Sequence, residues 1–197
     1  MGDNKRMTLE LRGLQVFTDE LEEDKQVGIK LIGSRTDNFL GIIRGPMGTP
    51  YEGGIFQLDI IVPKEYPYEP PKVKFITRIW HPNISSQTGA ICLDILKDAW
   101  SPALTLRTVM LSIQALLSSP EPNDPQDALV ASLYKSDYQE YIETAKSWTQ
   151  MYAKPTSKEE RIKRFLDMGF NRESVIKALE RNNWDENLAL NELLFEN

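Results

Sequence analysis

Near the N-terminus, the less polar residues recur every three or four positions among polar neighbours. Such spacing is typical of an amphipathic helix, and it predicts one over about residues 4–20. The positions on its apolar side are Leu11, Leu14, Thr18 and Leu21. Gly13 lies inside this segment and weakens the expected helix by roughly 1 kcal/mol relative to alanine.

Four segments that follow have the spacing of β-strands. Apolar residues alternate with polar ones or form short runs, and glycines at Gly33 and from Gly45 to Gly54 supply turns. The segments cover residues 27–31, 39–43, 56–62 and 72–75. Together they predict a four-stranded antiparallel sheet.

The helical spacing returns after residue 100. It predicts three helices, which cover residues 105–117, 127–134 and 137–152. The proline-rich stretch from Pro120 to Pro125 cannot continue a helix, so it predicts a structured loop between the first two. Strands followed by helices indicate an α+β domain, which we place at residues 1–153.

The C-terminal residues are expected to form a second, smaller domain. Residues 154–157 have the composition of a linker, and Ser157 and Glu160 have the spacing of a helix-capping box. Three short helices are expected beyond this point, over residues 158–167, 172–181 and 186–195. We therefore predict a three-helix domain over residues 158–197.

Composition and charge exclude several classes of protein. The 41% hydrophobic and 26% charged residues are those of an ordinary soluble globular protein. The net charge of −6 argues against a nucleic-acid partner, because phosphate binding needs surplus positive charge. No apolar run approaches the length of a membrane span, and the first residues lack the apolar core of a signal peptide. We therefore expect a cytoplasmic protein that contacts no membrane, with the nucleus as a second compartment.

The chain contains one cysteine, Cys92, and one histidine, His81. A lone thiol cannot form an internal disulfide, and a zinc site needs more ligands of these two types, so we expect no metal. The neighbours Gly89 and Asp94 suit an accessible nucleophile, whereas the apolar residues between them suit a buried strand. Free cysteine is among the residues most often buried, so local sequence leaves both interpretations open.

Four motifs together resemble the signature of ubiquitin-conjugating enzymes. His81-Pro82-Asn83 is followed, nine residues after its asparagine, by Cys92 in the context GAICLDIL. The other three motifs are YEGG from Tyr51, YPYEPPKVKF from Tyr66 and WSPALTL from Trp100. Because they match in order and spacing over roughly residues 5–152, the combination is highly specific. The resemblance implies the fold of that family, with an N-terminal helix, a four-stranded antiparallel sheet and C-terminal helices.

The resemblance also implies a chemistry. In this family a cysteine accepts activated ubiquitin from an activating enzyme as a thioester and passes it to a lysine amine. By position, Cys92 would carry the thioester. Asn83 would steady the active-site loop and stabilise the oxyanion. His81 and Pro82 would mainly shape the turn.

Two acidic residues match positions that flank the family's cysteine. By this resemblance, Asp94 and Asp124 would attract and orient the incoming lysine. For Asp124 an alternative stays open, because Asn-Asp-Pro is a turn sequence in its own right. The resemblance further implies a docking face for ligases and the activating enzyme, formed by Lys5, Arg6, Pro67, Tyr68, Ser101, Pro102 and Ala103.

The C-terminal segment resembles a ubiquitin-associated domain. The resemblance lies in Met168-Gly169-Phe170 and in the downstream sequence ALERNNWDENLALNELL. It implies ubiquitin binding through Met168, Gly169, Phe170, Leu193 and Leu194. The alternative is that Met168 and Phe170 only complete a very small core.

The resemblance as a whole is to conjugating enzymes that build polyubiquitin chains and carry this second domain. It implies ubiquitin, an activating enzyme, RING-type ligases and substrate proteins as partners, with the enzyme itself a monomer. It implies no cofactor, since the upstream activating enzyme uses the ATP. Conjugation of another ubiquitin-like modifier and a non-catalytic ubiquitin-binding scaffold are the alternatives. A thiol protease is disfavoured, because His81 and Asn83 share one turn. This leaves little freedom for the histidine to pair with the thiol while the asparagine orients the histidine from its other side.

Overall fold

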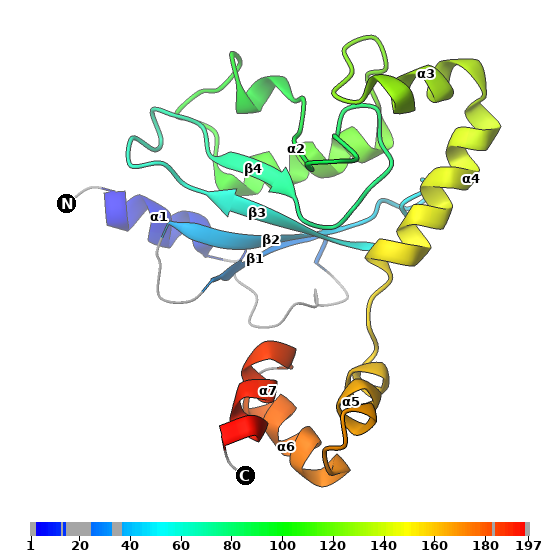
Figure 1. The fold of residues 1–197 in the computed structure, drawn as a ribbon. Helices are drawn as coiled ribbons and strands as arrows, with labels where there is room; N and C mark the ends of the chain where they lie inside the picture. Colours follow the sequence, from blue (N-terminus) through cyan, green and yellow to red (C-terminus); the bar gives the residue numbers. More distant parts are fainter. Residues whose placement is uncertain (1–2, 13, 15–24, 33–36, 183, 196–197) are drawn as a thin grey trace. The chain divides into compact units, whose positions relative to one another are not determined.

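The computed structural model of the chain describes residues 3–12, 14, 25–32, 37–182 and 184–195. It contains two compact units, one extending to Lys154 and one beginning at Pro155 (Figure 1). Within these residues, no helix is both long and apolar enough to cross a membrane.

The first unit is built on a four-stranded antiparallel sheet in the order β1-β2-β3-β4, which confirms the predicted sheet. The strands are β1 (Val27–Leu31), β2 (Asn38–Arg44), β3 (Ile55–Ile61) and β4 (Lys72–Phe75). Strands that are neighbours in sequence are neighbours in the sheet, because short connections favour pairing between successive strands. The turn predicted at Gly33 lies outside the described residues.

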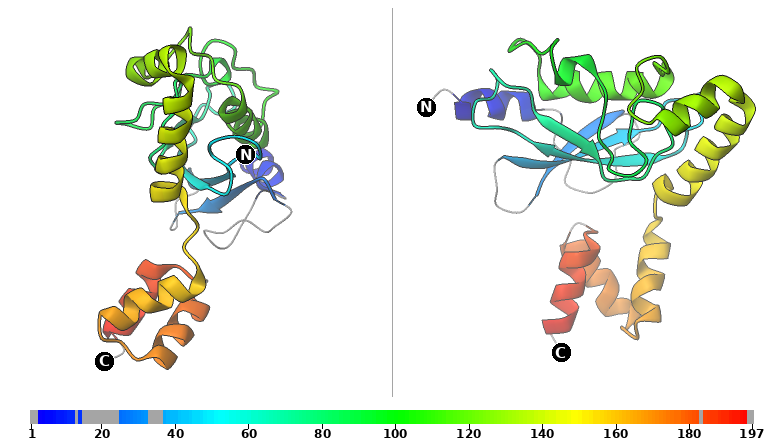
Figure 2. Two further views of the ribbon diagram at one scale, coloured as in Figure 1. Left: turned by 90° about the vertical axis from the view of Figure 1, so that its right-hand side faces the viewer. Right: turned by 45° about the horizontal axis from the view of Figure 1, so that its top comes forward.

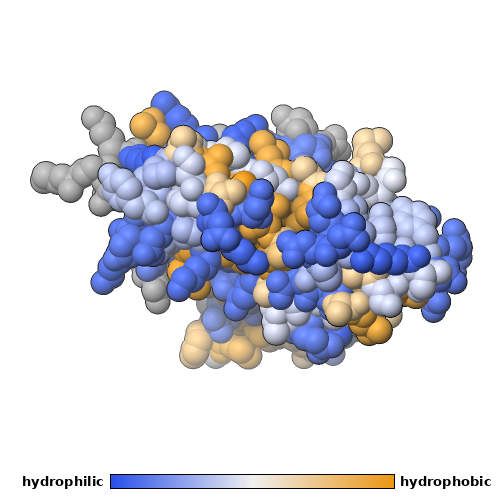
Figure 3. Space-filling view, turned by 90° about the horizontal axis from the view of Figure 1, so that it is seen from above, coloured by the Kyte–Doolittle hydropathy of each residue, from blue (hydrophilic) through white to orange (hydrophobic). Residues whose placement is uncertain are grey.

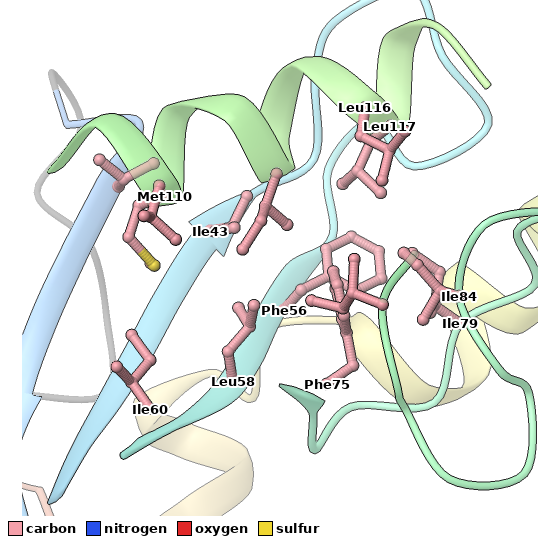
Figure 4. Packing of buried hydrophobic residues seen from close by; sticks show 14 of the residues in the cluster. Ile43, Phe56, Leu58, Ile60, Phe75, Ile79, Ile84, Met110, Leu116 and Leu117 are labelled. Atoms are coloured by element: carbon pink, nitrogen blue, oxygen red, sulfur yellow. The ribbon is translucent and has the colours of Figure 1, made fainter. Parts of the chain in front are cut away.

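Helix α2 (Leu106–Ser118) covers one face of this sheet. Its buried positions recur at helical spacing and are Leu106, Val109, Met110, Ile113, Leu116 and Leu117. Figure 4 shows Met110 and the Leu116–Leu117 pair directed at the strands. Gly41 permits this close packing, because a Cβ there would lie 2.7 Å from Cδ1 of Ile60 and 3.0 Å from Cε of Met110. The helix begins at Leu106 because the Thr105 side chain accepts a hydrogen bond from the Thr108 N–H.

The first helix is shorter than predicted. Helix α1 (Asp3–Leu11) is followed by a turn in which the Leu14 N–H donates to the Leu11 carbonyl. The Leu14 carbonyl then accepts a 2.7 Å hydrogen bond from Ile29 in β1, and the Leu14 side chain is fully buried. Pairing with the sheet therefore ends the helix, and the prediction of helix through Leu14 was wrong. The remainder of that predicted helix, residues 15–20, lies outside the described residues.

Helices α3 (Ala128–Ser136) and α4 (Tyr138–Trp148) lie beyond one end of the sheet (Figures 1 and 2). Each is capped by the aspartate that precedes it, since Asp127 accepts from the Val130 N–H and Asp137 from the Glu140 N–H. The short π-helical segment η2 (Thr149–Ala153) follows α4, so only part of the helix predicted over 137–152 is α-helical.

The second unit consists of α5 (Lys158–Asp167), α6 (Arg172–Arg181) and α7 (Glu186–Phe195). These bounds agree with the predicted helices, and the capping box between Ser157 and Glu160 is present. A small core holds the helices together and consists of Ile162, Phe165, Val175, Ala178, Leu179, Ala189 and Leu193.

Candidate active site

Cys92 lies at the end of a tight turn that follows the His81-Pro82-Asn83 motif. The turn is closed by an antiparallel bridge between Ile84 and Ile91, and the Cys92 N–H donates to the Asn83 carbonyl at 2.9 Å. The two isoleucines are buried, while the cysteine itself is half-buried. The strand-like residues around Cys92 therefore attach the turn to the core and leave the thiol accessible.

Two charged side chains contact the thiol. The Sγ atom donates to Oδ2 of Asp124 at 3.7 Å, and Nζ of Lys97 donates to Sγ at 3.4 Å. The ammonium can stabilise the sulfur when it is a thiolate. The carboxylate can accept a hydrogen bond from the sulfur when it is a thiol. The sequence interpretation missed Lys97. It could have been found from the motif CLDILK, because the short helix η1 (Asp94–Leu96) turns the chain back toward the cysteine.

The thiol opens onto a shallow groove of about 730 Å³ between the cysteine turn, α2 and the loop before α3. Its lining includes Asn83, Cys92, Asp94, Lys97 and Asp124. Figure 3 shows this side of the first unit from above, where apolar surface lies between many hydrophilic side chains. An open groove of this kind suits an extended polypeptide better than a small molecule, which proteins usually enclose.

Asn83 is buried, and its side-chain amide holds the loop that carries Asp124. Its Oδ1 accepts from the Glu121 N–H at 2.8 Å. Its Nδ2 donates to the carbonyls of Glu121 and Asp124, both at 2.9 Å. Both hydrogens of the amide are thus in use, so donation to an oxyanion would require one of these bonds to open.

His81 is fully buried and both of its ring nitrogens are paired. Nδ1 accepts from the Asn83 N–H at 3.0 Å, so Nε2 carries the hydrogen and donates to the Leu116 carbonyl at 3.0 Å. Burial lowers the pKa of His81 to about 4, although the bond to Leu116 works in the opposite direction. The neutral ring has no nitrogen left to act as a base toward Cys92.

The two predicted acidic residues are both exposed and both line the groove. Asp94 is the first residue of η1, and its Oδ1 accepts from the N–H of the next residue, Ile95, at 2.7 Å. Asp124 contacts the thiol directly. The structure therefore brings Asp124 to the sulfur and places Asp94 beside the groove, where its carboxylate accepts from Ile95 and does not contact the sulfur.

The loop before α3 is tied to the cysteine turn at a second place that the sequence interpretation missed. The buried Pro82 contributes its carbonyl, which accepts from the N–H groups of Gln126 and Asp127, both at 2.9 Å. Oδ2 of Asp127 accepts from the backbone N–H of Ser86 at 3.0 Å and from its hydroxyl at 2.7 Å. Burial tends to raise the pKa of Asp127, but the hydrogen bonds from Ser86 and Val130 outweigh it and lower the pKa.

The predicted docking residues lie on connected segments. Arg6 in α1 donates to the Leu104 carbonyl at 2.9 Å and lies over the Tyr66 ring. Trp100 donates to the Pro67 carbonyl at 2.8 Å, which joins the proline-rich loop to the segment after it. The exposed members of this face are Tyr68, Ser101, Pro102 and Ala103. Lys5 belongs to α1, but its side chain lies outside the described part.

The second unit exposes part of its predicted binding surface. Met168 is 62% exposed and Leu194 56% exposed, so neither serves the small core. Gly169 has a φ of +95°, which glycine adopts without strain, and Phe170 packs partly against Phe165. Leu193 is only 5% exposed and belongs to the core, so its assignment to the binding surface was wrong.

The sequence matches two family models, the ubiquitin-conjugating enzyme model over residues 7–149 and the UBA/TS-N domain model over residues 157–193. The chain belongs to the ubiquitin-conjugating enzyme family. Ubiquitin-conjugating enzyme E2 K of Homo sapiens is 50% identical over 187 residues, which cover 93% of each chain. Ubiquitin-conjugating enzyme E2 27 of Arabidopsis thaliana is 61% identical over 153 residues, 78% of this chain and 80% of that one.

Solved structures agree with this assignment. The E2 domain of a ubiquitin-conjugating enzyme from Toxoplasma gondii is 52% identical, with a TM-score of 0.70, and the match covers 77% of this chain and 99% of that one. The chain is thus a ubiquitin-conjugating enzyme with a C-terminal ubiquitin-associated domain. Within the described residues, no group of three or more histidine, cysteine or acidic side chains could hold a metal ion.

Proposed function

We propose that Cys92 accepts ubiquitin as a thioester from the activating enzyme. One observation carries the proposal: the accessible sulfur lies at an open groove with Nζ of Lys97 at 3.4 Å and Oδ2 of Asp124 at 3.7 Å. The Cys92 thiolate attacks the carbonyl carbon of the incoming thioester, and the activating enzyme's thiol leaves as a thiolate. The Lys97 ammonium stabilises the negative charge on sulfur while this exchange proceeds.

In the second step, a lysine amine attacks the thioester carbonyl on Cys92. The nitrogen forms an amide bond, the bond to sulfur breaks, and the amine gives up a proton as the thiolate leaves. Asp124 attracts and orients the amine from beside the sulfur, and Asp94 contributes negative charge at the rim of the groove. Asn83 acts first through the loop that it holds, and its oxyanion role requires one of its two donor bonds to open.

The face formed by α1, the proline-rich loop and the segment 100–103 is proposed to dock the activating enzyme and RING-type ligases. Glu10 organises it, since its carboxylate accepts from Tyr66, from the Leu106 N–H and from Arg6. These bonds join α1, the loop and the start of α2, so the exposed Tyr68 and Pro102 are presented on a rigid base.

The ubiquitin-associated domain is proposed to bind ubiquitin through Met168, Gly169, Phe170 and Leu194, and to favour polyubiquitin chains. A short linker keeps a weakly bound acceptor chain at high effective concentration near Cys92. The proposed reaction requires no metal or organic cofactor on this enzyme, since ATP is used by the activating enzyme. Action in the cytoplasm and the nucleus is part of the proposal, because one free thiol suits a reducing compartment.

The decisive experiment incubates the enzyme with activating enzyme, ATP and one modifier at a time. Non-reducing gels should show an adduct with ubiquitin that disappears when reductant is added. An adduct only with another ubiquitin-like modifier would favour the alternative substrate, and no adduct with any modifier would favour a non-catalytic scaffold. Gels of longer reactions, run with reductant, should show free polyubiquitin chains if chain building is correct.

A further inference from the structure

One carboxylate joins the two chain segments that carry the thiol and the acid. Asp127 belongs to the loop that carries Asp124, and its Oδ2 accepts two hydrogen bonds from Ser86. Ser86 lies at the start of the turn that leads to Cys92, where the Ser85 N–H donates to the Ala90 carbonyl. The bond between Asp127 and Ser86 therefore connects the supports of both reacting partners.

The direct contact between those partners is too weak to hold them in place. A thiol is a weak hydrogen-bond donor, and the 3.7 Å contact joins Cys92 to an exposed aspartate. Within this loop, Pro120, Pro122 and Pro125 have no N–H and cannot donate backbone hydrogen bonds. Its position thus depends on its hydrogen bonds to the neighbouring turn, which are those of the Asn83 amide to Glu121 and Asp124 and those of the Pro82 carbonyl and Ser86 at its end.

Asp127 is well placed to fix the end of the loop. Its second oxygen, Oδ1, accepts from the Val130 N–H at 3.3 Å and caps α3. A carboxylate is favoured at a helix N-terminus, and Ser86 is largely buried, so these bonds are sheltered from water. The same side chain thus holds α3, the loop and the cysteine turn together.

We propose that Asp127, acting through Ser86, is a positioning residue for aminolysis: it keeps Asp124 in register with the thioester carbonyl while lysine attacks. This inference rests on the proposed function, because it requires a thioester on Cys92. Asp127 does not touch the reacting atoms. Thioester formation does not need Asp124 to orient an amine, and the cysteine turn is also closed by the Ile84–Ile91 bridge and by the bond from the Cys92 N–H to Asn83, so charging does not depend on Asp127.

The test follows discharge of preformed ubiquitin thioester over a range of free lysine concentrations. Asp127→Ala should lower the maximal discharge rate roughly 10- to 100-fold, as expected when a reacting group is misplaced by about 1 Å. Charging by the activating enzyme should stay at the wild-type rate, which also shows that the variant is folded. Ser86→Ala should give a smaller loss, since it removes one of the two bonds.

Two further variants separate positioning from helix capping. Asp127→Asn should restore part of the rate, because its single amide oxygen can replace Oδ2 toward Ser86 but leaves a nitrogen in the place of Oδ1 toward the Val130 N–H. Asp137→Ala is the matched control, since Asp137 caps α4 through the Glu140 N–H and its side chain makes no hydrogen bond to the loop before α3. Its discharge rate should equal that of the wild type.

Three results would overturn the inference. The first is a wild-type discharge rate in Asp127→Ala, and the second is an equal slowing in Asp137→Ala. In both of these the thioester forms, so the proposed function stands. In the third, wild-type enzyme forms no thioester, and the proposed function falls together with the inference.

Discussion

The Sγ atom of Cys92 lies 3.7 Å from Oδ2 of Asp124, although 32 positions separate the two residues in sequence. The Asp124 carbonyl in turn accepts from Nδ2 of Asn83, whose own carbonyl accepts from the Cys92 N–H. Asn83 thus bonds to the backbone of both members of the pair. These bonds hold the acid and the thiol in place, while the exposed carboxylate and the half-buried thiol remain accessible to an incoming amine.

The first prediction concerns the thiol itself. Cys92→Ser should form an adduct with ubiquitin that resists thiol reductants, because an alkoxide is a poorer leaving group than a thiolate and the resulting ester is more stable. Cys92→Ala should form no adduct, since it has no nucleophilic atom. Both variants are compared with wild type on reducing and non-reducing gels. If the alanine variant still charged, the nucleophile would have to be another residue.

The second prediction separates the two steps of the reaction. Asn83→Ala and Asp124→Ala should leave charging largely intact and slow single-turnover discharge to lysine. Asp124→Ala removes the carboxylate that orients the attacking amine. Asn83→Ala should lose more, about 100- to 1,000-fold if an oxyanion donor is also lost, because it releases the loop at Glu121 and Asp124 together.

The control for this pair is Asp94→Ala, which removes a carboxylate that lines the groove but makes no hydrogen bond to the sulfur. It should slow discharge less than Asp124→Ala does. Wild-type discharge rates in both Asn83→Ala and Asp124→Ala would contradict the roles assigned to them.

Parts of the fold follow from local sequence and parts do not. The helices of the second unit begin where the sequence places them, because Ser157 and Asn171 are strong capping residues with partners within three positions. The first helix ends early because Leu14 pairs with Ile29, a contact that no local pattern encodes. Tertiary pairing here outweighs helical periodicity.

The site shows the same division. The motif with Cys92 identifies the nucleophile, but Lys97 and Asp127 acquire their positions only when η1 and the loop before α3 fold against the cysteine turn. Leu193 was misplaced for a different reason. Apolar residues occupy several sides of α7, so the pattern does not show which of Leu193 and Leu194 faces the core.

The third prediction is a pH dependence of stability. The pKa of His81 is lowered to about 4 by burial, whereas in the unfolded chain it is about 6.5. Between pH 4 and 6.5, unfolding therefore takes up a proton at His81. Above about pH 6.5 this residue does not lower the free energy of unfolding, and below that pH it lowers it progressively until about pH 4. The free energy of unfolding should drop by about 3 kcal/mol across this window from this residue alone.

Because the chain has one histidine, its titration can be followed directly by NMR. The imidazole resonances of the folded protein should stay constant from pH 7.5 to 5, while urea unfolding at pH 7 and pH 5 gives the change in stability. An imidazole that titrates near pH 6.5 in the folded protein would disprove the prediction.

The fourth prediction compares two glycines with similar backbone conformations. Gly89, in the cysteine turn, has a φ of +74°, and an added Cβ would lie 2.0 Å from the Phe75 carbonyl oxygen. Gly53 has a φ of +78°, and an added Cβ would meet nothing within 4 Å. Gly53→Ala should cost about 1–2 kcal/mol for its conformation alone. Gly89→Ala should cost several kcal/mol more, since the Phe75 backbone must move.

Urea unfolding of both variants measures the difference. Gly89→Ala should also slow charging, because the displaced turn carries Cys92, whereas Gly53→Ala should charge normally. Equal losses of stability in the two variants would show that the clash at Gly89 is relieved without cost.

The last prediction concerns the ubiquitin-associated domain. Isotope-labelled enzyme titrated with ubiquitin should show chemical-shift changes at Met168, Gly169, Phe170 and Leu194, with a dissociation constant on the order of 0.1 mM for a contact this small. Leu194→Ala should weaken binding, because that side chain is 56% exposed at the end of α7. Leu188→Ala is the matched control, since Leu188 lies in the same helix and is 54% exposed. Both variants should charge Cys92 normally, while Leu194→Ala should build longer chains more slowly, because the domain raises only the local concentration of the acceptor. Absence of shifts at millimolar ubiquitin, or an equal effect of the two leucines, would mean that this surface serves another partner.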